Sequence, residues 1–220
     1  MAKTKKVDIE NTGLRQKPGT DGIEYDFHMT SVLKRLFPKI KWEDWIQEAA
    51  VYDSKGNSLK TPKKRNYTPD FRNDDLKLII EIDGAGARYS SHYCDPYECF
   101  KNSRGTELFE QLGYKVIRIP MYIQLDAEMI KFYFGIDYSE KLYYAADCHG
   151  FLHREIALPA SFCEAGIERF KKEMDSIPTS VRIIIIETLK CRIKKYMDLG
   201  IDESKSIRLV VPSSLDYLLR

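Results

Sequence analysis

The alternation of apolar and polar residues predicts a small α/β domain in the first half of the chain. After Asp21, a suitable N-cap, apolar residues recur at three- and four-residue steps, which predicts a helix that ends at Pro38. Three strands are expected next, over 45–52, 67–71 and 77–83, separated by turn-forming or basic stretches. The chain therefore begins its core as a helix followed by three strands.

The following segment predicts a strand–helix–strand unit. Asp95 and Pro96 form a strong helix start, with an acidic N-cap and a proline at the first helical position, and Gly113 ends that helix. A fourth strand is expected over 114–119. Strand 77–83 is apolar on both faces until its carboxylates appear, so we expect it to be a central strand. The short helical crossover favours parallel pairing between these two strands.

The second half of the chain contains apolar patterns but no motif with recognisable chemistry. We expect a helix over 127–134, strands over 141–146 and 151–156, and helices over 162–174 and 181–197, the last with an apolar side at Ile184 and Leu189. The predicted organisation is a basic flexible arm over 1–20, a core over 21–120, and an extension over 121–220 that packs on the core.

Composition narrows the class of protein only slightly. The chain has 220 residues, a net charge of +2 and 43% hydrophobic residues, which is ordinary for a globular protein. It contains no apolar run long enough to span a bilayer, and its first residues lack the apolar region of a secretory signal. Five cysteines without a CxxC pair favour reduced thiols and a cytoplasmic location. An alternative, zinc held by Cys148, His149, His153 and Cys163, fits no standard ligand spacing.

Three carboxylates are expected to meet at one end of the sheet. Glu81 and Asp83 are two residues apart on a strand and so share a face. Asp70 approaches Glu81 if strands 67–71 and 77–83 pair in antiparallel fashion through the turn at 72–75. Buried like charges raise one another's pKa, and a divalent cation relieves that repulsion. The alternative is that these acids lie in water or pair with Arg72, Lys77 or Arg88.

The order of these motifs resembles a known family. The run Tyr67-Thr68-Pro69-Asp70-Phe71, followed by Leu78–Gly84 and, after a helix, by Gly113–Ile119, resembles the PD-(D/E)xK nuclease superfamily. It is most similar to the small endonucleases related to very-short-patch-repair and restriction enzymes. The resemblance covers about residues 21–120. It implies a restriction-endonuclease-like α/β core of helix, three strands, helix and strand, with a mixed sheet flanked by helices and a C-terminal α+β extension.

The resemblance assigns roles to individual acids. Asp70 corresponds to the metal-binding acid of the Pro-Asp motif, and Glu81 to a second ligand, with the carbonyl of Ile82 as a third. Glu24 corresponds to the acid that many members supply from the first helix, and Asp26 is the substitute candidate. The implied cofactor is one or two Mg²⁺ ions, for which Mn²⁺ can substitute.

The chain departs from the family pattern at the position that usually holds a lysine. Asp83 stands there and is expected to hold a metal-bound water or add a ligand. A replacement cation is expected from Lys101 or Arg104, which share a helix face; the alternative is ordinary solvated surface. Related enzymes often carry a histidine where this chain has Ala87, and His92, five residues later, is the candidate general acid or base. A surface-loop histidine is the alternative.

These expectations together predict a metal-dependent DNA endonuclease, restriction-like or related to phages or mobile elements. The expected nucleic-acid contacts are Lys63, Lys64, Arg65, Arg88, Tyr89, His92 and Arg104, the alternatives being a solvated turn and tyrosines packed on the sheet. A homodimer would cut both strands and a monomer one. Asp83 in place of lysine motivates another function, a catalytically inactive subunit that binds nucleic acid or a protein. A third option is an RNA-directed nuclease on the same core.

Overall fold

A four-stranded sheet forms the centre of the protein. The computed structural model describes residues 29, 32–84, 92–120, 123, 125–138 and 162–187, and the backbone of 14–15 and 143–144. The sheet has the order β2-β3-β4-β5, with the strands Ile46–Gln47, Phe71–Asn73, Leu78–Asp83 and Lys115–Pro120. The fold is thus an α/β arrangement around a mixed, open sheet.

The two pairings of the long central strand β4 set the geometry of the site. β3 and β4 are antiparallel, with Phe71 opposite Ile80. β4 and β5 are parallel, with Glu81 opposite Arg118. Both the antiparallel and the parallel pairing confirm the prediction from the short turn and the helical crossover.

Local capping signals determine where the helices begin and end. Helix α2, Pro96–Gln111, starts at Asp95, whose carboxylate accepts a 2.8 Å hydrogen bond from the Tyr97 N–H. Gly113, at φ +82°, lies just beyond its end in a left-handed conformation that suits glycine. The other described helices are residues 32–36, α3 (Ala127–Phe134), α4 (Glu164–Ser176) and residues 179–187. The helices predicted near 96–112, 127–134 and 162–174 are confirmed, with shifts of one or two residues at their ends.

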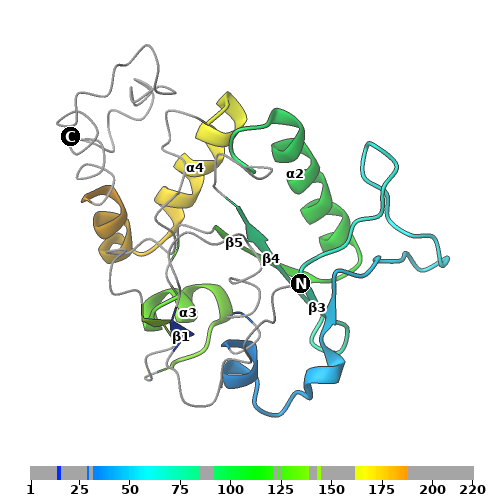
Figure 1. Ribbon diagram of the computed structural model, residues 1–220, viewed down its shortest axis with the longest axis horizontal. Helices are drawn as coiled ribbons and strands as arrows, with labels where there is room; N and C mark the ends of the chain where they lie inside the picture. The colour runs from blue at the N-terminus through cyan, green and yellow to red at the C-terminus, as the bar shows by residue number, and fades with distance from the viewer. Residues whose placement is uncertain are drawn as a thin grey trace, which may run out of the picture.

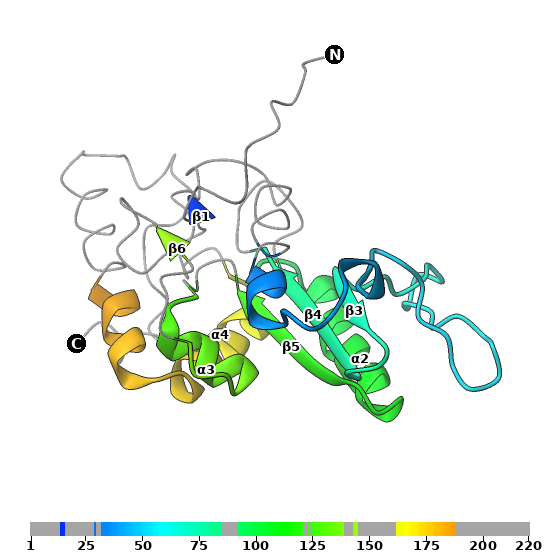
Figure 2. The same ribbon diagram turned by 90° about the horizontal axis from the view of Figure 1, so that it is seen from below.

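Helices cover both faces of the sheet (Figures 1 and 2). On the α2 face, Phe109 of α2 packs with Ile79 of β4 and with Val51 and Tyr67. On the other face, Leu78 and Ile80 join a larger core that includes buried residues of the helix at 32–36, of α3 and of α4. Because apolar residues lie on both faces of β4, the prediction of a central, doubly covered strand is confirmed.

The first two predicted strands are wrong in extent. Only Ile46–Gln47 of the predicted strand 45–52 is in the sheet, after a 3₁₀ turn at Trp42–Asp44. The second strand begins at Phe71 rather than Tyr67, because the backbone of Tyr67 pairs with Leu59 instead (Tyr67 N to Leu59 O, 3.0 Å). Pro69 also lacks an N–H for a ladder. Asp70 therefore lies at a bend immediately before β3, and the turn that follows is at 74–77.

The C-terminal extension contacts the core through α4, which packs against α2. In the helix at 179–187 Val181 and Ile185 are buried, whereas Ile184 is 45% exposed, so the predicted apolar side was wrong by one position. β6, Tyr143–Tyr144, lies within the predicted strand 141–146 and pairs in parallel with β1, Leu14–Arg15, inside the segment predicted as an arm. Several predictions lie outside the described residues. They are the strand over 151–156, residues 188–197 with Leu189, the start of the first helix and the histidines of the zinc alternative. No helix in the described part of the chain combines the length and apolar character needed to cross a membrane.

Candidate active site

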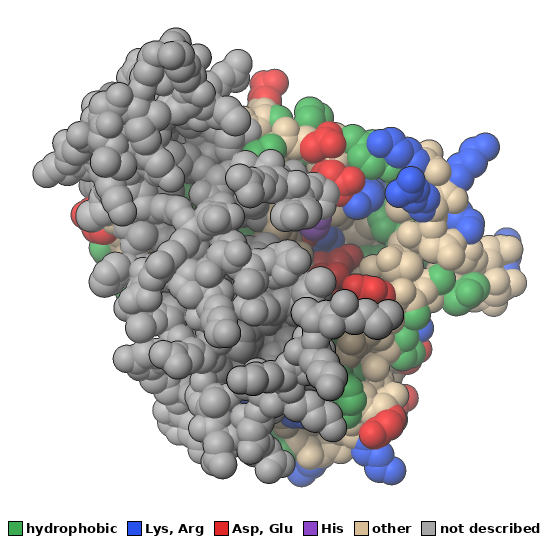
Figure 3. All heavy atoms as spheres, in the orientation of Figure 1, with side chains coloured by type: hydrophobic (Ala, Val, Ile, Leu, Met, Phe, Trp, Pro, Cys, Tyr) green, Lys and Arg blue, Asp and Glu red, His purple; other side chains and the backbone are tan. Residues whose placement is uncertain are grey.

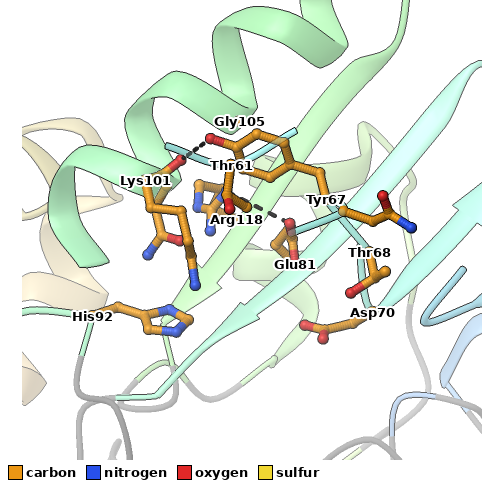
Figure 4. Close-up of a pocket in the computed structure, with 11 residues that line it drawn as sticks. Thr61, Tyr67, Thr68, Asp70, Glu81, His92, Lys101, Gly105 and Arg118 are labelled. Atoms are coloured by element: carbon orange, nitrogen blue, oxygen red, sulfur yellow. Dashed lines mark hydrogen bonds and ion pairs between the residues drawn. The ribbon is translucent and has the colours of Figure 1, made fainter. Parts of the chain in front are cut away.

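A pocket of about 180 Å³ opens where the segment before β3 meets β4, β5 and α2 (Figure 4). Its lining residues are Thr61, Asn66, Tyr67, Thr68, Asp70, Glu81, His92, Lys101, Asn102, Gly105 and Arg118. Four residues predicted from the sequence meet here: Asp70, Glu81, His92 and Lys101. They come from four separate parts of the chain, so the fold, and not sequence proximity, brings them together.

Two carboxylates lie side by side in this pocket. The register of β3 and β4 carries Asp70 next to Glu81, as predicted. The Asp70 Oδ2 accepts a 2.6 Å hydrogen bond from the backbone N–H of Ile82, which fixes its orientation. Burial raises the pKa of Glu81, and the guanidinium of Arg118, 3.9 Å from its Oε1, only partly opposes that rise. One acid of the pair is thus held in a setting that disfavours its ionised form.

Asp70 and Glu81 have the donor chemistry of a magnesium site. Mg²⁺ prefers carboxylate oxygens and is commonly held by one or two of them, with water completing its shell. A cation here would also favour ionisation of Glu81, which burial now opposes. Among the described residues no group of three or more His, Cys, Asp or Glu side chains is placed to hold a metal. Ile82, predicted as a further ligand through its carbonyl, is not among the residues that line the pocket.

Asp83 has a different role from the one predicted. It shares the face of Glu81, but its side chain is completely buried and is not part of the pocket lining. The Asp83 Oδ1 lies 2.5 Å from Nδ1 of His92, and both carboxylate oxygens accept 2.8 Å hydrogen bonds from Arg118. Arg169 of α4 also donates to Oδ2. Burial opposes ionisation, but the two guanidiniums hold the pKa of Asp83 well below its ordinary value.

Asp83 was expected to hold a metal-bound water or add a metal ligand, but in the structure its carboxylate contacts Arg118, Arg169 and His92 instead of lining the pocket. Its carboxylate is fully engaged, and it acts as a buried counter-ion that orients other groups. A cation does reach the pocket, from Arg118 on β5. Arg118 was not among the residues predicted from the sequence, although parallel pairing across the short crossover places it directly opposite Glu81.

His92 and Lys101 face the two carboxylates from the other side of the pocket (Figure 4). Because Nδ1 of His92 donates to the ionised Asp83, the second ring nitrogen, Nε2, remains for another partner. Lys101 lines the pocket and forms an ion pair with Glu98, one turn earlier on α2. Arg104, the alternative cation on the same face, does not line the pocket and pairs with Glu107 at 2.8 Å.

Asn102 is a second pocket residue that was not predicted from the sequence. Its side chain lines the pocket and is only 6% exposed, yet its Nδ2 has no hydrogen-bond partner. A buried amide donor without a partner is costly, which suggests that a ligand accepts from it. Gly105, on the next turn, lets the Tyr67 ring pack closely, since a Cβ there would lie 2.8 Å from that ring. No sequence signal identified either residue, because their roles depend on packing between distant segments.

Helix α4 holds the segment that carries His92. The carbonyl of Tyr93 accepts a 2.9 Å hydrogen bond from the Cys163 N–H, and the Tyr93 hydroxyl donates to Glu173 at 2.7 Å. Gly166 allows this contact, since a Cβ there would lie 1.8 Å from the Tyr93 carbonyl oxygen. The guanidinium of Arg169 lies 4.4 Å from the centre of the Tyr93 ring. The extension is thus part of the structure that forms the site.

The remaining predicted residues lie beside the pocket or outside the described part of the chain. Lys63, Lys64 and Arg65 are exposed on a turn next to the pocket. Glu24, Asp26, Arg88 and Tyr89 are outside the described residues. No protein-family model matches the chain, and no curated protein or solved structure is significantly similar to it. Any functional assignment therefore depends on the chemistry of the pocket.

Proposed function

We propose that this protein is a metal-dependent endonuclease that hydrolyses phosphodiester bonds in DNA. The observation that carries the proposal is the meeting of Asp70 and Glu81 in one pocket, opposite His92, Lys101 and Asn102. Hydrolysis of a phosphodiester needs compensation of negative charge at the phosphate and a group that manages the proton of the attacking water. The pocket presents oxygen ligands on one wall, and hydrogen-bond donors and a histidine on the other.

The described residues divide the chemistry among them. Asp70 and Glu81 would hold Mg²⁺, which when bound supplies positive charge at the phosphate and lowers the pKa of water. Lys101 and the unpartnered Nδ2 of Asn102 donate to the non-bridging phosphate oxygens. His92, held by Asp83 through Nδ1, accepts a proton from water at Nε2.

Asp83 supports one competing function, a nuclease-like protein without activity that binds nucleic acid. No lysine occupies the position the superfamily uses, and Asp83 is taken up by Arg118 and Arg169. A related alternative keeps the same chemistry but directs it at RNA. Metal binding alone does not separate these functions, because an inactive site can still hold Mg²⁺; cleavage does.

The proposal is tested by cleavage of supercoiled plasmid in Mg²⁺, Mn²⁺ or EDTA. Asp70→Asn and Glu81→Gln should each lower the cleavage rate by on the order of 10²–10³-fold, as removal of an electrostatic stabiliser at a reacting centre commonly does. The matched control is Asp137→Asn, which removes an exposed carboxylate whose ion pair, among the described residues, is with Lys131. This control should cleave like the wild type.

Three other results would each decide against the proposal or redirect it. Cleavage that survives both substitutions means that the site lies elsewhere. No cleavage by any form, on plasmids of varied sequence and methylation, supports the inactive binding protein. Faster cleavage of a matched RNA than of DNA under the same conditions supports the RNA-directed enzyme.

A further inference from the structure

A basic turn, residues 60–66, lies beside the pocket. Lys60 and Asn66 face each other across an antiparallel bridge, and the turn is closed by 2.8 Å backbone hydrogen bonds from Thr61 N to Arg65 O and from Lys64 N to Thr61 O. The segment between β2 and β3 that carries it, cyan in Figure 1, projects beyond the edge of the sheet beside α2. The basic turn is thus a small two-stranded ribbon whose residues 62–66 are exposed within the part of the chain that the structure describes.

The charged side chains of this ribbon are all positive. Residues 58–69 contain Lys60, Lys63, Lys64 and Arg65 and no acid. The last three are exposed, and no ion pair described for this protein involves them. Lysine and arginine side chains gather on this part of the surface, beside a hollow where acidic side chains are seen (Figure 3). Uncompensated cations at this density attract a polyanion.

The backbone at Lys64 adds an independent observation. Lys64 has φ +61°, in the left-handed region where a residue other than glycine or asparagine is strained. A glycine would relieve that strain without loss of any described contact of the side chain. Strained backbone of this kind is concentrated at functional sites. Glu48 and Lys77 also have positive φ angles, so the strain at Lys64 supports a role for its charge only together with the exposed cations around it.

The basic turn is also continuous with the pocket. Thr61 and Asn66, at its two ends, belong to the pocket lining together with Asp70 and Glu81. Lys63 lies with its Nζ 3.7 Å from the centre of the Tyr97 ring, in the first turn of α2. A chain of phosphates that placed one group in the pocket would meet these cations next.

We propose that the basic turn holds the sugar-phosphate backbone of duplex DNA while one phosphate of the same strand occupies the pocket. This inference rests on the proposed function for the identity of the polyanion. Single-stranded binding surfaces pair cations with open aromatic faces for base stacking. Here Tyr67 is buried and the ring of Tyr97 is covered by Lys63, while residues 60–66 contain no aromatic residue.

The shape of the turn favours the B-form duplex in particular. A two-stranded ribbon fits the wide major groove of B-DNA, whereas the deep, narrow major groove of A-form RNA does not admit it. The cations then lie along the groove edge, where the phosphates are.

The test measures binding, not cleavage, by fluorescence anisotropy in EDTA at several salt concentrations. The probes are a labelled DNA duplex, its single strand and a duplex RNA of the same sequence. The triple variant Lys63→Ala, Lys64→Ala and Arg65→Ala should lower the slope of log K against log salt by about 2.7 for the DNA duplex, since each phosphate contact contributes about 0.9. Lys64→Gly alone should lower it by about 0.9.

Lys77→Gly is the matched control. Lys77 also has a positive φ, +49°, so the substitution removes one charge and relieves the same kind of backbone strain. Lys77 precedes β4 at the end remote from Glu81 and lies over the Tyr114 ring. Its variant should bind DNA with the wild-type slope, and the urea unfolding midpoints of both glycine variants show that each is folded.

The outcomes separate this inference from the proposed function. An unchanged slope for the triple variant overturns the role of the basic turn, whether or not the protein cuts DNA. Tighter binding of the single strand or the RNA duplex than of the DNA duplex overturns the choice of ligand. A reduced slope in a protein that never cleaves supports the basic turn and rejects the nuclease.

Discussion

Glu81 and Asp83 are two carboxylates on one face of one strand, yet their surroundings shift their pKa values in opposite directions. Glu81 faces a pocket, and burial raises its pKa. Asp83 is more deeply buried, but Arg118, Arg169 and His92 surround it, and its pKa is held well below the ordinary value. The two pKa values shift in opposite directions because the charged neighbours of the two carboxylates differ, and not because of how deeply each is buried.

This comparison shows how one strand can carry a reactive end and a stable end. A carboxylate whose negative charge is poorly compensated by neighbouring cations is available to bind a ligand. A carboxylate whose charge is fully compensated orients the cations and the histidine around it. Asp83, which contributes to stability, holds His92 in place. Glu81, which detracts from stability, faces the pocket. Urea denaturation of variants of these two residues, in Mg²⁺, in EDTA and over a range of pH, tests this contrast.

The largest effect on stability is expected for Asp83→Asn. The substitution removes the buried carboxylate that Arg118 and Arg169 share and leaves them only Glu81 at 3.9 Å and Glu173 at 2.7 Å, respectively. Breaking a buried charge pair commonly costs about 3–5 kcal/mol. Urea denaturation should show this loss in the free energy of unfolding. Asp137→Asn, at an exposed ion pair, should cost less than about 1 kcal/mol. Equal losses for the two variants would show that the Asp83 network contributes no more than a surface pair.

A second, intermediate effect is expected from Mg²⁺. If Asp70 and Glu81 hold the ion, a concentration about 100 times the dissociation constant should stabilise the wild type by about 2.7 kcal/mol. The free energy of unfolding in Mg²⁺ and in EDTA measures this difference. The stabilisation should disappear in Glu81→Gln. An ion that stabilises Glu81→Gln as much as the wild type binds somewhere else.

The smallest effect is expected for Glu81→Gln in EDTA, with a pH dependence of definite sign. The folded-state pKa of Glu81 lies above 4.5, so its contribution to stability is present at low pH and is lost as pH rises through the raised pKa. Glu81→Gln should therefore gain stability relative to the wild type as pH rises from below 4.5 through the raised pKa of Glu81.

The contribution of Asp83 to the free energy of unfolding changes with pH in the opposite direction over the acidic range. Its folded-state pKa lies below 3.8, so its contribution is present above that value and is lost as pH falls through the lowered pKa. The destabilisation caused by Asp83→Asn should shrink on acidification. Parallel pH profiles for the two variants would contradict the contrast between the two acids.

The part of this structure that follows from the sequence is the part specified by neighbouring residues. Asp95, Pro96 and Gly113 predicted α2 to within a residue, because capping is a local property. The two apolar faces of β4 predicted its central place, and the short turn and crossover predicted both pairings. Asp70 and Glu81 followed from those pairings.

The remaining features depend on contacts between distant segments. The strand expected at Tyr67 is displaced because Tyr67 pairs with Leu59, a choice among competing partners that propensity does not decide. Asp83 and Glu81 look alike in sequence, and only Arg169 and the position of His92 tell them apart. Nothing near Arg169 marks it as a partner of the central strand.

The contact between Asp83 and Arg169 has a consequence for how the protein is made. The two residues are 86 positions apart, so β4 and α2 leave the ribosome long before α4 does. Until then Asp83 lacks one of its two guanidiniums, and the segment of His92 and Tyr93 lacks the helix that holds it. Long-range contacts of this kind form late in folding. A nascent chain that ends before α4 should therefore contain every residue that lines the pocket but lack the helix that holds the segment of His92 and Tyr93.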